Sequence, residues 1–172
     1  MSRYLLLFRH AKSAWDTGAA TDFDRPLASR GERDAPIMGK WLNNQGLVPD
    51  IVISSPALRA KQTSEAACQK MGIKQKEINW DSRVYAATVS ELLEVLKKYN
   101  KKPKTIMLVG HNPDLEDLLI YLVGDGIQMP PDGKLLPTAA VAYLEMPDNW
   151  KDLAEGVGQL VSITRVKDIS LS

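Results

Sequence analysis

Two histidines are the side chains of this sequence whose placement most strongly suggests chemistry. The chain holds only these two: His10 comes after Arg9 and an apolar run at 4–8, and His111 follows a second apolar run at 105–109 after one glycine. Runs this short and this apolar indicate strands that are buried on both faces. Ligands of open α/β sheets bind at the carboxyl ends of such strands, so we expect both histidines at a functional site.

An oxyanion such as phosphate is the ligand that the surrounding residue types favour. Arg9 lies beside His10, and Arg59 falls in the first turn of a helix whose start signal is Ser55. Guanidinium groups bind phosphate oxygens through paired hydrogen bonds, and the helix amino termini after Ser55 and Asn112 add backbone N–H groups and a positive dipole end. The sequence therefore predicts convergent positive charge around His10.

In such a setting the neutral imidazole of His10 can act as a nucleophile. Nearby cations lower the pKa of a histidine, which keeps a lone pair on a ring nitrogen at neutral pH. We expect His10 to attack phosphorus and form a phosphohistidine that water then hydrolyses. His111 and the arginines would hold the equatorial oxygens, where charge stabilisation supplies most of the rate enhancement.

Alternating strand and helix patterns surround these residues. The helix start signals are a capping box at 29–32, Ser55 with proline in the first helical position, a capping box at 88–91, and Asn112 followed by proline. The expected strands are 4–8, 50–54, 76–80, 105–109, 139–146 and 159–166. This order predicts one three-layer α/β/α domain over residues 1–172, with a mostly parallel central sheet and helices on both faces.

Composition excludes several classes of protein. The 22 basic and 21 acidic residues among 172 leave a net charge of +1, so we expect no nucleic-acid or membrane partner. The single cysteine, Cys68, indicates a reducing compartment, and no apolar stretch has the length of a signal sequence or membrane span. We therefore expect a cytoplasmic protein. Two histidines flanked by arginines, without clustered carboxylates, make a metal site an unfavoured alternative, and we expect no metal or cofactor.

Three ordered segments carry a resemblance to a known family. The segment Arg9-His10-Ala11-Lys12-Ser13 resembles the Arg-His-Gly signature of the histidine phosphatase superfamily, which includes the phosphoglycerate mutases. Residues 55–63 resemble the second arginine segment of that superfamily, and residues 110–113 resemble its second histidine segment. The resemblance implies a phosphoglycerate mutase-like fold. It also implies that His10 is the phosphorylated nucleophile, in a phosphate pocket formed with the catalytic residues Arg9, Arg59 and His111.

Within the superfamily, residues 9–13 and the downstream Asp24–Leu27 are similar to the SixA-like branch of small bacterial phosphohistidine phosphatases. This resemblance implies that Arg25 adds to the phosphate pocket. Ser13 and Asn112 are further candidate phosphate contacts, although the hydroxyl of Ser13 could equally cap local backbone. The mutase pattern is not kept, because alanine follows His10 in place of glycine and Lys12 stands where the mutases have glutamate.

The leaving group decides the expected substrate. An alkoxide, whose conjugate acid has a pKa of about 15, needs a proton donor, whereas imidazole leaves more readily because its conjugate acid has a pKa of about 6.5. No counterpart of the general-acid glutamate of larger members is evident. Asp22 is the candidate donor that we single out; Asp24, Asp81 and Glu116 are further candidates, and each of the four is as readily explained as a loop or cap carboxylate.

We therefore expect a metal-independent phosphatase that acts on phosphohistidine, for example in a phosphotransfer domain of a two-component relay, and that holds phosphate or sulfate in its pocket. The alternative enzyme is a general phosphomonoesterase for small phosphoesters. A mutase is less expected, because it requires enclosure and an acid. A catalytically idle module that binds phosphoproteins is a further alternative.

Overall fold

A mixed six-stranded sheet forms the middle layer of the protein. The computed structural model describes residues 2–100 and 102–169, and the sheet order within them is β3-β2-β4-β1-β5-β6. The strands are β1 (Arg3–Arg9), β2 (Ile51–Ser54), β3 (Ile78–Trp80), β4 (Thr105–Gly110), β5 (Val141–Met146) and β6 (Gln159–Thr164). Only β5 runs against the others, since it pairs antiparallel with both β1 and β6. The predicted, mostly parallel sheet is confirmed.

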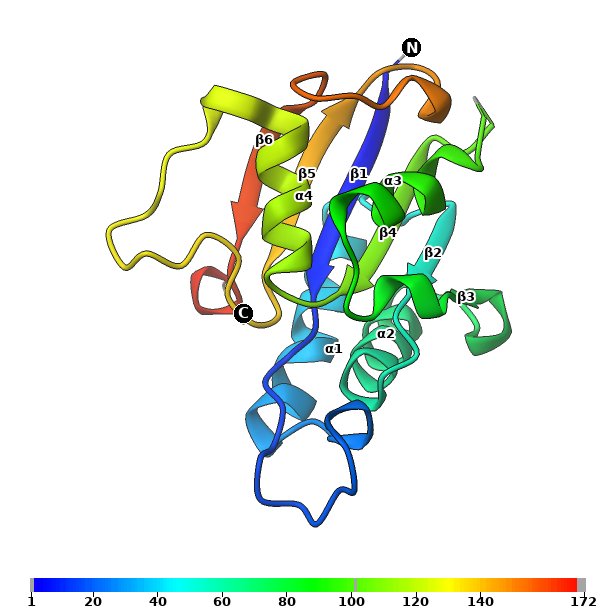
Figure 1. Ribbon diagram of the computed structural model, residues 1–172. Helices are drawn as coiled ribbons and strands as arrows, with labels where there is room; N and C mark the ends of the chain where they lie inside the picture. The colour runs from blue at the N-terminus through cyan, green and yellow to red at the C-terminus, as the bar shows by residue number, and fades with distance from the viewer. Residues whose placement is uncertain (1, 101, 170–172) are drawn as a thin grey trace.

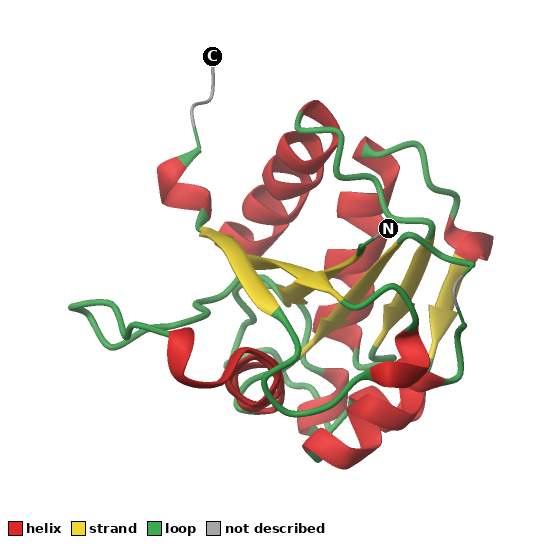
Figure 2. Cartoon of the chain, turned by 90° about the horizontal axis from the view of Figure 1, so that it is seen from above, coloured by secondary structure: helices red, strands yellow, loops and turns green. Residues whose placement is uncertain are grey.

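Four α-helices cover the two faces of this sheet (Figures 1 and 2). They are α1 (Ser29–Asn44), α2 (Leu58–Lys70), α3 (Val89–Lys97) and α4 (Asp114–Val123). Alternate residues of β1 point to opposite faces. Leu5 and Leu7 pack in the cluster that contains α3 and α4, whereas Leu6 and Phe8 pack with α1 and α2. The predicted three-layer α/β/α arrangement follows from this double burial.

Three helix starts differ from the sequence prediction. Helix α4 begins at Asp114 with Pro113 as its N-cap, and the predicted cap Asn112 donates to the carbonyl of Leu136 instead. No side-chain hydrogen bond caps α1: its N-cap is Ala28, whose backbone N–H donates to the carbonyl of Lys12, so the turn is fixed by the loop after β1. Helix α2 begins at Leu58 rather than at the predicted proline, because the Ser55 hydroxyl accepts from the N–H of Ala57 before the helix starts. The predicted capping box at 88–91 is confirmed.

The strand predicted at 76–80 is shorter than expected. Residues Gln75–Glu77 form a 3₁₀ turn, and only Ile78–Trp80 pair with β2. The last two strands are likewise trimmed at their ends relative to 139–146 and 159–166. Within the part of the chain that the structure describes, no helix combines the length and apolarity needed to cross a membrane.

The central strands bring the sequence motifs together. Strands β1 and β4 are parallel neighbours with Arg9 opposite Gly110, so the residues that follow each strand leave the sheet at the same edge. The backbone N–H of His10 donates to the carbonyl of Gly110 at 3.0 Å. On the other side of β4, the N–H of Ser55 donates to the carbonyl of Val109 at 3.0 Å. The segments that follow β1, β2 and β4 therefore lie side by side at one edge of the sheet.

Candidate active site

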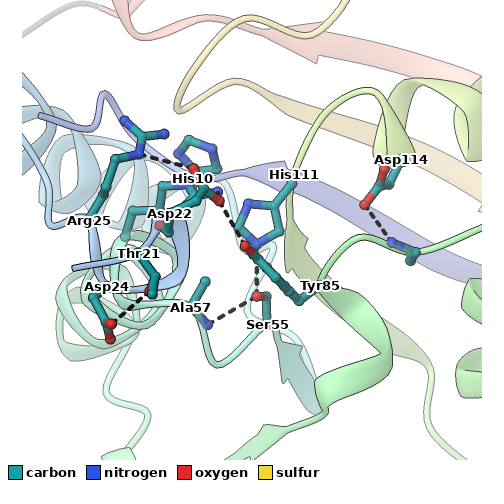
Figure 3. Close-up of polar contacts among 12 residues, drawn as sticks. His10, Thr21, Asp22, Asp24, Arg25, Ser55, Ala57, Tyr85, His111 and Asp114 are labelled. Carbon is teal, nitrogen blue, oxygen red and sulfur yellow. Dashed lines mark hydrogen bonds and ion pairs between the residues drawn. The ribbon is translucent and has the colours of Figure 1, made fainter. Parts of the chain in front are cut away.

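The two histidine rings lie against each other at the carboxyl end of the sheet (Figure 3). Their ring centroids are 5.1 Å apart, and both side chains are buried. Nδ1 of His10 lies 2.7 Å from the carbonyl oxygen of Ala11. Because a carbonyl oxygen only accepts, Nδ1 carries the proton and the lone pair of the neutral ring is on Nε2.

Burial and neighbouring cations keep both rings neutral. Burial is the largest cause that lowers the pKa of His10 to about 3, and the charges of His111, Arg59 and Arg9 lower it further, against the raising effect of the Ala11 hydrogen bond. Burial, followed by Arg59, lowers the pKa of His111 to about 4. An unprotonated imidazole at neutral pH is the form in which a histidine can attack phosphorus.

Two residues hold the His111 ring in place, one directly after β2 and one in the segment after β3. Its Nε2 lies 2.8 Å from the hydroxyl oxygen of Ser55, and the ring of Tyr85 meets it edge-on with centroids 5.4 Å apart. Nδ1 of His111 is buried and has no hydrogen-bond partner among the described residues. Buried polar atoms rarely go without a partner, so this nitrogen is available to a ligand in the pocket.

Three arginines surround the histidines from different elements. Arg9 ends β1 and donates from Nη1 to the carbonyl of Leu136 at 3.2 Å. Arg59 is buried in the first turn of α2 and donates to Asp22 twice, from Nη1 to its carbonyl at 2.7 Å and from Nη2 to its carboxylate at 2.9 Å. Arg25 donates from Nε to the same carboxylate at 3.1 Å. The charges of Arg9 and Arg59 act on His10, and Arg25 joins Arg59 at the Asp22 carboxylate.

Asp22 is an ionised acceptor in this arrangement. Its carboxylate accepts from Tyr85 at 2.8 Å, Arg59 and Arg25. The Tyr85 hydrogen bond is the largest cause that lowers the Asp22 pKa to about 2, with Arg59 and Arg25 adding to it. A carboxyl group with that pKa carries no proton at neutral pH, so the geometry does not favour the proton-donor role considered for Asp22. Its carboxylate instead occupies the guanidinium groups to which an anion would bind.

The other carboxylates that the sequence offered as donors have structural partners. Asp24 accepts from the hydroxyl of Thr21 at 2.8 Å, and Asp81 caps a short 3₁₀ turn (Ser82–Val84) while accepting from Arg83. Glu116 accepts from the backbone N–H of Leu136 at 2.8 Å. These bonds fit the loop and cap roles considered for them.

Two predicted substrate contacts, Asn112 and Ser13, sit at the border of the site. Asn112 donates from Nδ2 to the carbonyl of Leu136 at 2.8 Å, the same acceptor that Arg9 uses, and thereby fixes the loop before β5. Ser13 is buried and forms an isolated backbone bridge with Leu27. A direct phosphate contact by either side chain stays a prediction.

Several site residues have no signal in the sequence pattern. Tyr85 reaches His111 and Asp22 from the segment after β3, and Thr63 accepts from the N–H of Ala11 at 3.0 Å while donating to the carbonyl of Arg59. Ser55 did have a signal: it follows a short strand, as both histidines do, although we interpreted it only as a helix cap. The described residues contain no group of three or more His, Cys, Asp or Glu side chains that could hold a metal ion.

Comparison with known proteins identifies the family of this chain. The family model for the histidine phosphatase superfamily (branch 1) matches residues 5–84. Phosphohistidine phosphatase SixA of Escherichia coli is 39% identical over 160 residues, which is 86% of this chain and 91% of that protein. An uncharacterised protein of Mycobacterium tuberculosis is 34% identical over 157 residues, covering 89% of this chain and 96% of the relative.

Solved structures with the same fold include two SixA proteins. A protein from Agrobacterium tumefaciens, provisionally assigned as phosphohistidine phosphatase SixA, superposes with a TM-score of 0.78 at 28% identity over 96% of this chain and 99% of that chain. The protein histidine phosphatase SixA complexed with tungstate has a TM-score of 0.81 at 23% identity, over 96% of this chain and 98% of that chain. This second likeness supports the fold alone.

Proposed function

Since this chain belongs to the histidine phosphatase superfamily, we propose that it removes the phosphoryl group from phosphohistidine on a protein, through a phosphohistidine intermediate at His10. The observation that carries the proposal is the orientation of this one ring. The hydrogen bond from Nδ1 to the Ala11 carbonyl leaves the Nε2 lone pair as the reactive one, and burial among cations keeps it unprotonated.

In the first step, Nε2 of His10 forms a bond to phosphorus while the bond from phosphorus to the substrate nitrogen breaks. The substrate ring, protonated on its other nitrogen, leaves as neutral imidazole. His10 becomes the phosphorylated, positively charged ring, and its Nδ1–H continues to donate to Ala11. In the second step water attacks phosphorus, the P–Nε2 bond breaks, and the products are neutral His10 and dihydrogen phosphate. Charge and protons balance in both steps.

The arginines and His111 stabilise the charge on the transferring group. The phosphoryl oxygens would exchange with the Asp22 carboxylate at Arg59 and Arg25, while Arg9 supplies a further donor. Nδ1 of His111 also donates in the tautomer whose Nε2 accepts from the Ser55 hydroxyl. Donors such as the buried Arg59 act strongly because electrostatic interactions are less screened in a buried site than in water. Each is expected to contribute about 10²-fold or more to the rate of transfer.

The ionised state of Asp22 supports a nitrogen leaving group. The carboxylate of Glu116 accepts from a backbone N–H. An alkoxide would need a proton from such a group as it departs, whereas the imidazole of phosphohistidine departs neutral. This supports a phosphohistidine protein over a small phosphoester, which stays the alternative function.

Direct comparison of substrates tests the proposal. The protein is supplied with a histidine-containing phosphotransfer domain carrying phosphohistidine, and in parallel with a phosphoserine peptide and glycerol phosphate. We expect faster release of phosphate from the domain, and acid-labile phosphate on His10 in samples quenched early. The variant His10→Asn, checked for folding by circular dichroism, should lose both. Faster cleavage of the esters would replace the proposal with the esterase, and tight binding without any phosphorylated His10 would replace it with the idle module.

A further inference from the structure

A strongly basic cleft lies beside the phosphate pocket and has no role in the chemistry above. Its volume is about 310 Å³. Five cations line it: Arg30 and Arg33 from the start of α1, Lys134 from the loop before β5, and Arg165 and Lys167 from the end of the chain. We call this group of five the basic cleft. The rest of the chain is nearly neutral, since the whole sequence carries a net charge of only +1.

Two acidic residues neutralise only part of this charge. Asp34 lies 3.2 Å from Arg33 and 3.8 Å from Arg30, and Asp132 pairs with Arg165 at 2.6 Å. Five cations against two carboxylates give the lining of the cleft a net charge of +3, and Asp168 beside Lys167 also acts on Arg165. Lys134 and Lys167 are exposed and form no ion pair within residues 2–100 and 102–169.

The two arginines of α1 partner the buried Asp34, Arg30 at i,i+4, but neither the helix dipole nor packing favours them at this position. Arg30 lies in the first turn and Arg33 directly after it, near the amino terminus where the helix dipole is positive. Cations at that end are unfavourable by a few tenths of a kcal/mol to about 1 kcal/mol. Both side chains are largely exposed, at 56% and 68%, so packing does not require them either. Their exposed guanidinium groups can therefore meet an anion from solvent in addition to Asp34.

One loop segment connects the cleft with the histidine site. The carbonyl of Leu136 accepts from Arg9, and two residues later Thr138 lines the cleft and accepts from Arg30 at 3.2 Å. The next residue, Ala139, donates its N–H to the carbonyls of both Arg9 and His10 at 3.1 Å. A ligand that enters the pocket therefore passes close to the cleft.

The remaining wall comes from the end of the chain. The short helix η6 (Val166–Asp168) contacts α1, and Figure 1 shows it at the same edge of the sheet as the end of β1. A neighbouring cavity shares Asp132, Arg165 and Lys167 with the cleft and adds Asp168, whereas the cavity lined by Asp50 and Lys102 lies at the opposite edge of the sheet. The charge is thus concentrated beside the site.

We infer that the basic cleft binds acidic side chains of the phosphorylated protein, next to its phosphohistidine, and so selects protein substrates by charge. The inference rests on the proposed function, because it names a property of that same substrate. A positive cleft attracts and orients an acidic surface without contacting the reacting atoms, so it lowers KM and leaves kcat unchanged. Exposed ion pairs each contribute modestly and are screened by salt, so two such pairs predict a KM effect of about fivefold at low salt.

Two matched peptides test this inference. Each carries one phosphohistidine at its centre, flanked in one peptide by glutamates and in the other by glutamines. We expect the wild-type protein to hydrolyse the glutamate peptide with a KM about fivefold lower at low salt, and the difference to vanish at about 0.5 M salt. The double variant Arg33→Glu with Lys167→Glu should lose this preference while its kcat for the glutamine peptide is unchanged.

Control variants separate charge in the cleft from net charge and from folding. Lys76→Glu with Lys102→Glu alters two exposed lysines outside the cleft by the same total charge and should keep the preference. The neutral pair Arg33→Gln with Lys167→Gln should show an intermediate preference. Urea unfolding of all variants checks that they fold alike.

The outcomes are distinguishable. Equal KM values of the two peptides for the wild-type protein, or an unchanged preference in the cleft variant, would overturn the inference while leaving the proposed function intact. Failure to hydrolyse either peptide, with active cleavage of glycerol phosphate, would overturn the proposed function and the inference together. If the cleft variant lost only the hydrolysis of a small bisphosphate such as fructose 1,6-bisphosphate, the cleft would be assigned to a second phosphate of a small molecule.

Discussion

The neutral state of His10 can be measured through the stability of the protein. The ring has a pKa of about 3 in the folded protein, against an ordinary value near 6.5 in the unfolded chain. The folded pKa is depressed, so the unfolded chain binds the proton more readily. Stability is therefore complete above about pH 6.5 and declines as pH falls from there toward 3.

The size of this effect follows from the two pKa values. Lowering the pH from about 7.5 to about 4.5 protonates the ring in the unfolded chain only, which lowers the free energy of unfolding by about 2.5 kcal/mol. His10→Asn removes the titrating ring, and its loss of stability over the same interval should be smaller by about 2.5 kcal/mol. Comparing each protein with itself at two pH values cancels the change in packing that the substitution introduces.

Urea unfolding at the two pH values, followed by circular dichroism, gives these free energies. The protein contains only two histidines, so NMR of the His111→Asn variant reports on the ring of His10 alone. We expect that resonance to stay constant down to about pH 5. An equal pH dependence in the wild-type protein and His10→Asn, or a ring that titrates near 6.5, would refute the view that burial among cations keeps the nucleophile unprotonated.

Three further perturbations have defined outcomes. Arg59→Lys should lower kcat/KM for a phosphohistidine domain by about 10²-fold, because an ammonium group cannot replace the paired guanidinium donors; a loss below threefold would contradict this. Gly31→Ala should destabilise the protein by about 1 to 3 kcal/mol in urea, because a Cβ there would lie 2.2 Å from the carbonyl oxygen of Lys12; unchanged stability would show that α1 can shift away. Trp150→Ala should cost about 3 to 5 kcal/mol, because the side chain is fully buried, and Trp150→Phe about 1 kcal/mol for the lost hydrogen bond to the Pro103 carbonyl; equal losses in the two variants would contradict that division.

Local patterns made the strands and most helices predictable. A buried strand is an uninterrupted apolar run, and residues 4–8 and 105–109 are such runs, so the positions of His10 and His111 at strand ends could be read directly. The capping box at 88–91 was also correct, because both of its hydrogen bonds lie within four residues. The predicted cap at Ser29 was wrong because a tertiary contact, from Ala28 to Lys12, fixes that helix start instead.

The contacts within the site depended on segments that are far apart in the sequence. Asp22 contacts Arg59, which is 37 residues away in the sequence, and Tyr85, which is 63 residues away. The local sequence pattern around any one of these residues does not indicate the other two. The sequence therefore offered Asp22 as a proton donor, whereas its partners in the fold make it an ionised acceptor. Its pKa is a property of the packed loop and not of the residue type.

The amino-acid sequence by itself determined which side chains stand at the ends of buried strands, because apolar runs and cap signals are local and survive in any arrangement of the elements. Only the tertiary structure decided that β1 and β4 are neighbours, that Asp22 pairs with Arg59 and Tyr85, and that α1 and residues 165–167 combine their cations in one cleft. These features arise when the whole sheet packs, since hydrogen bonds and electrostatic effects depend on distances that no local pattern specifies.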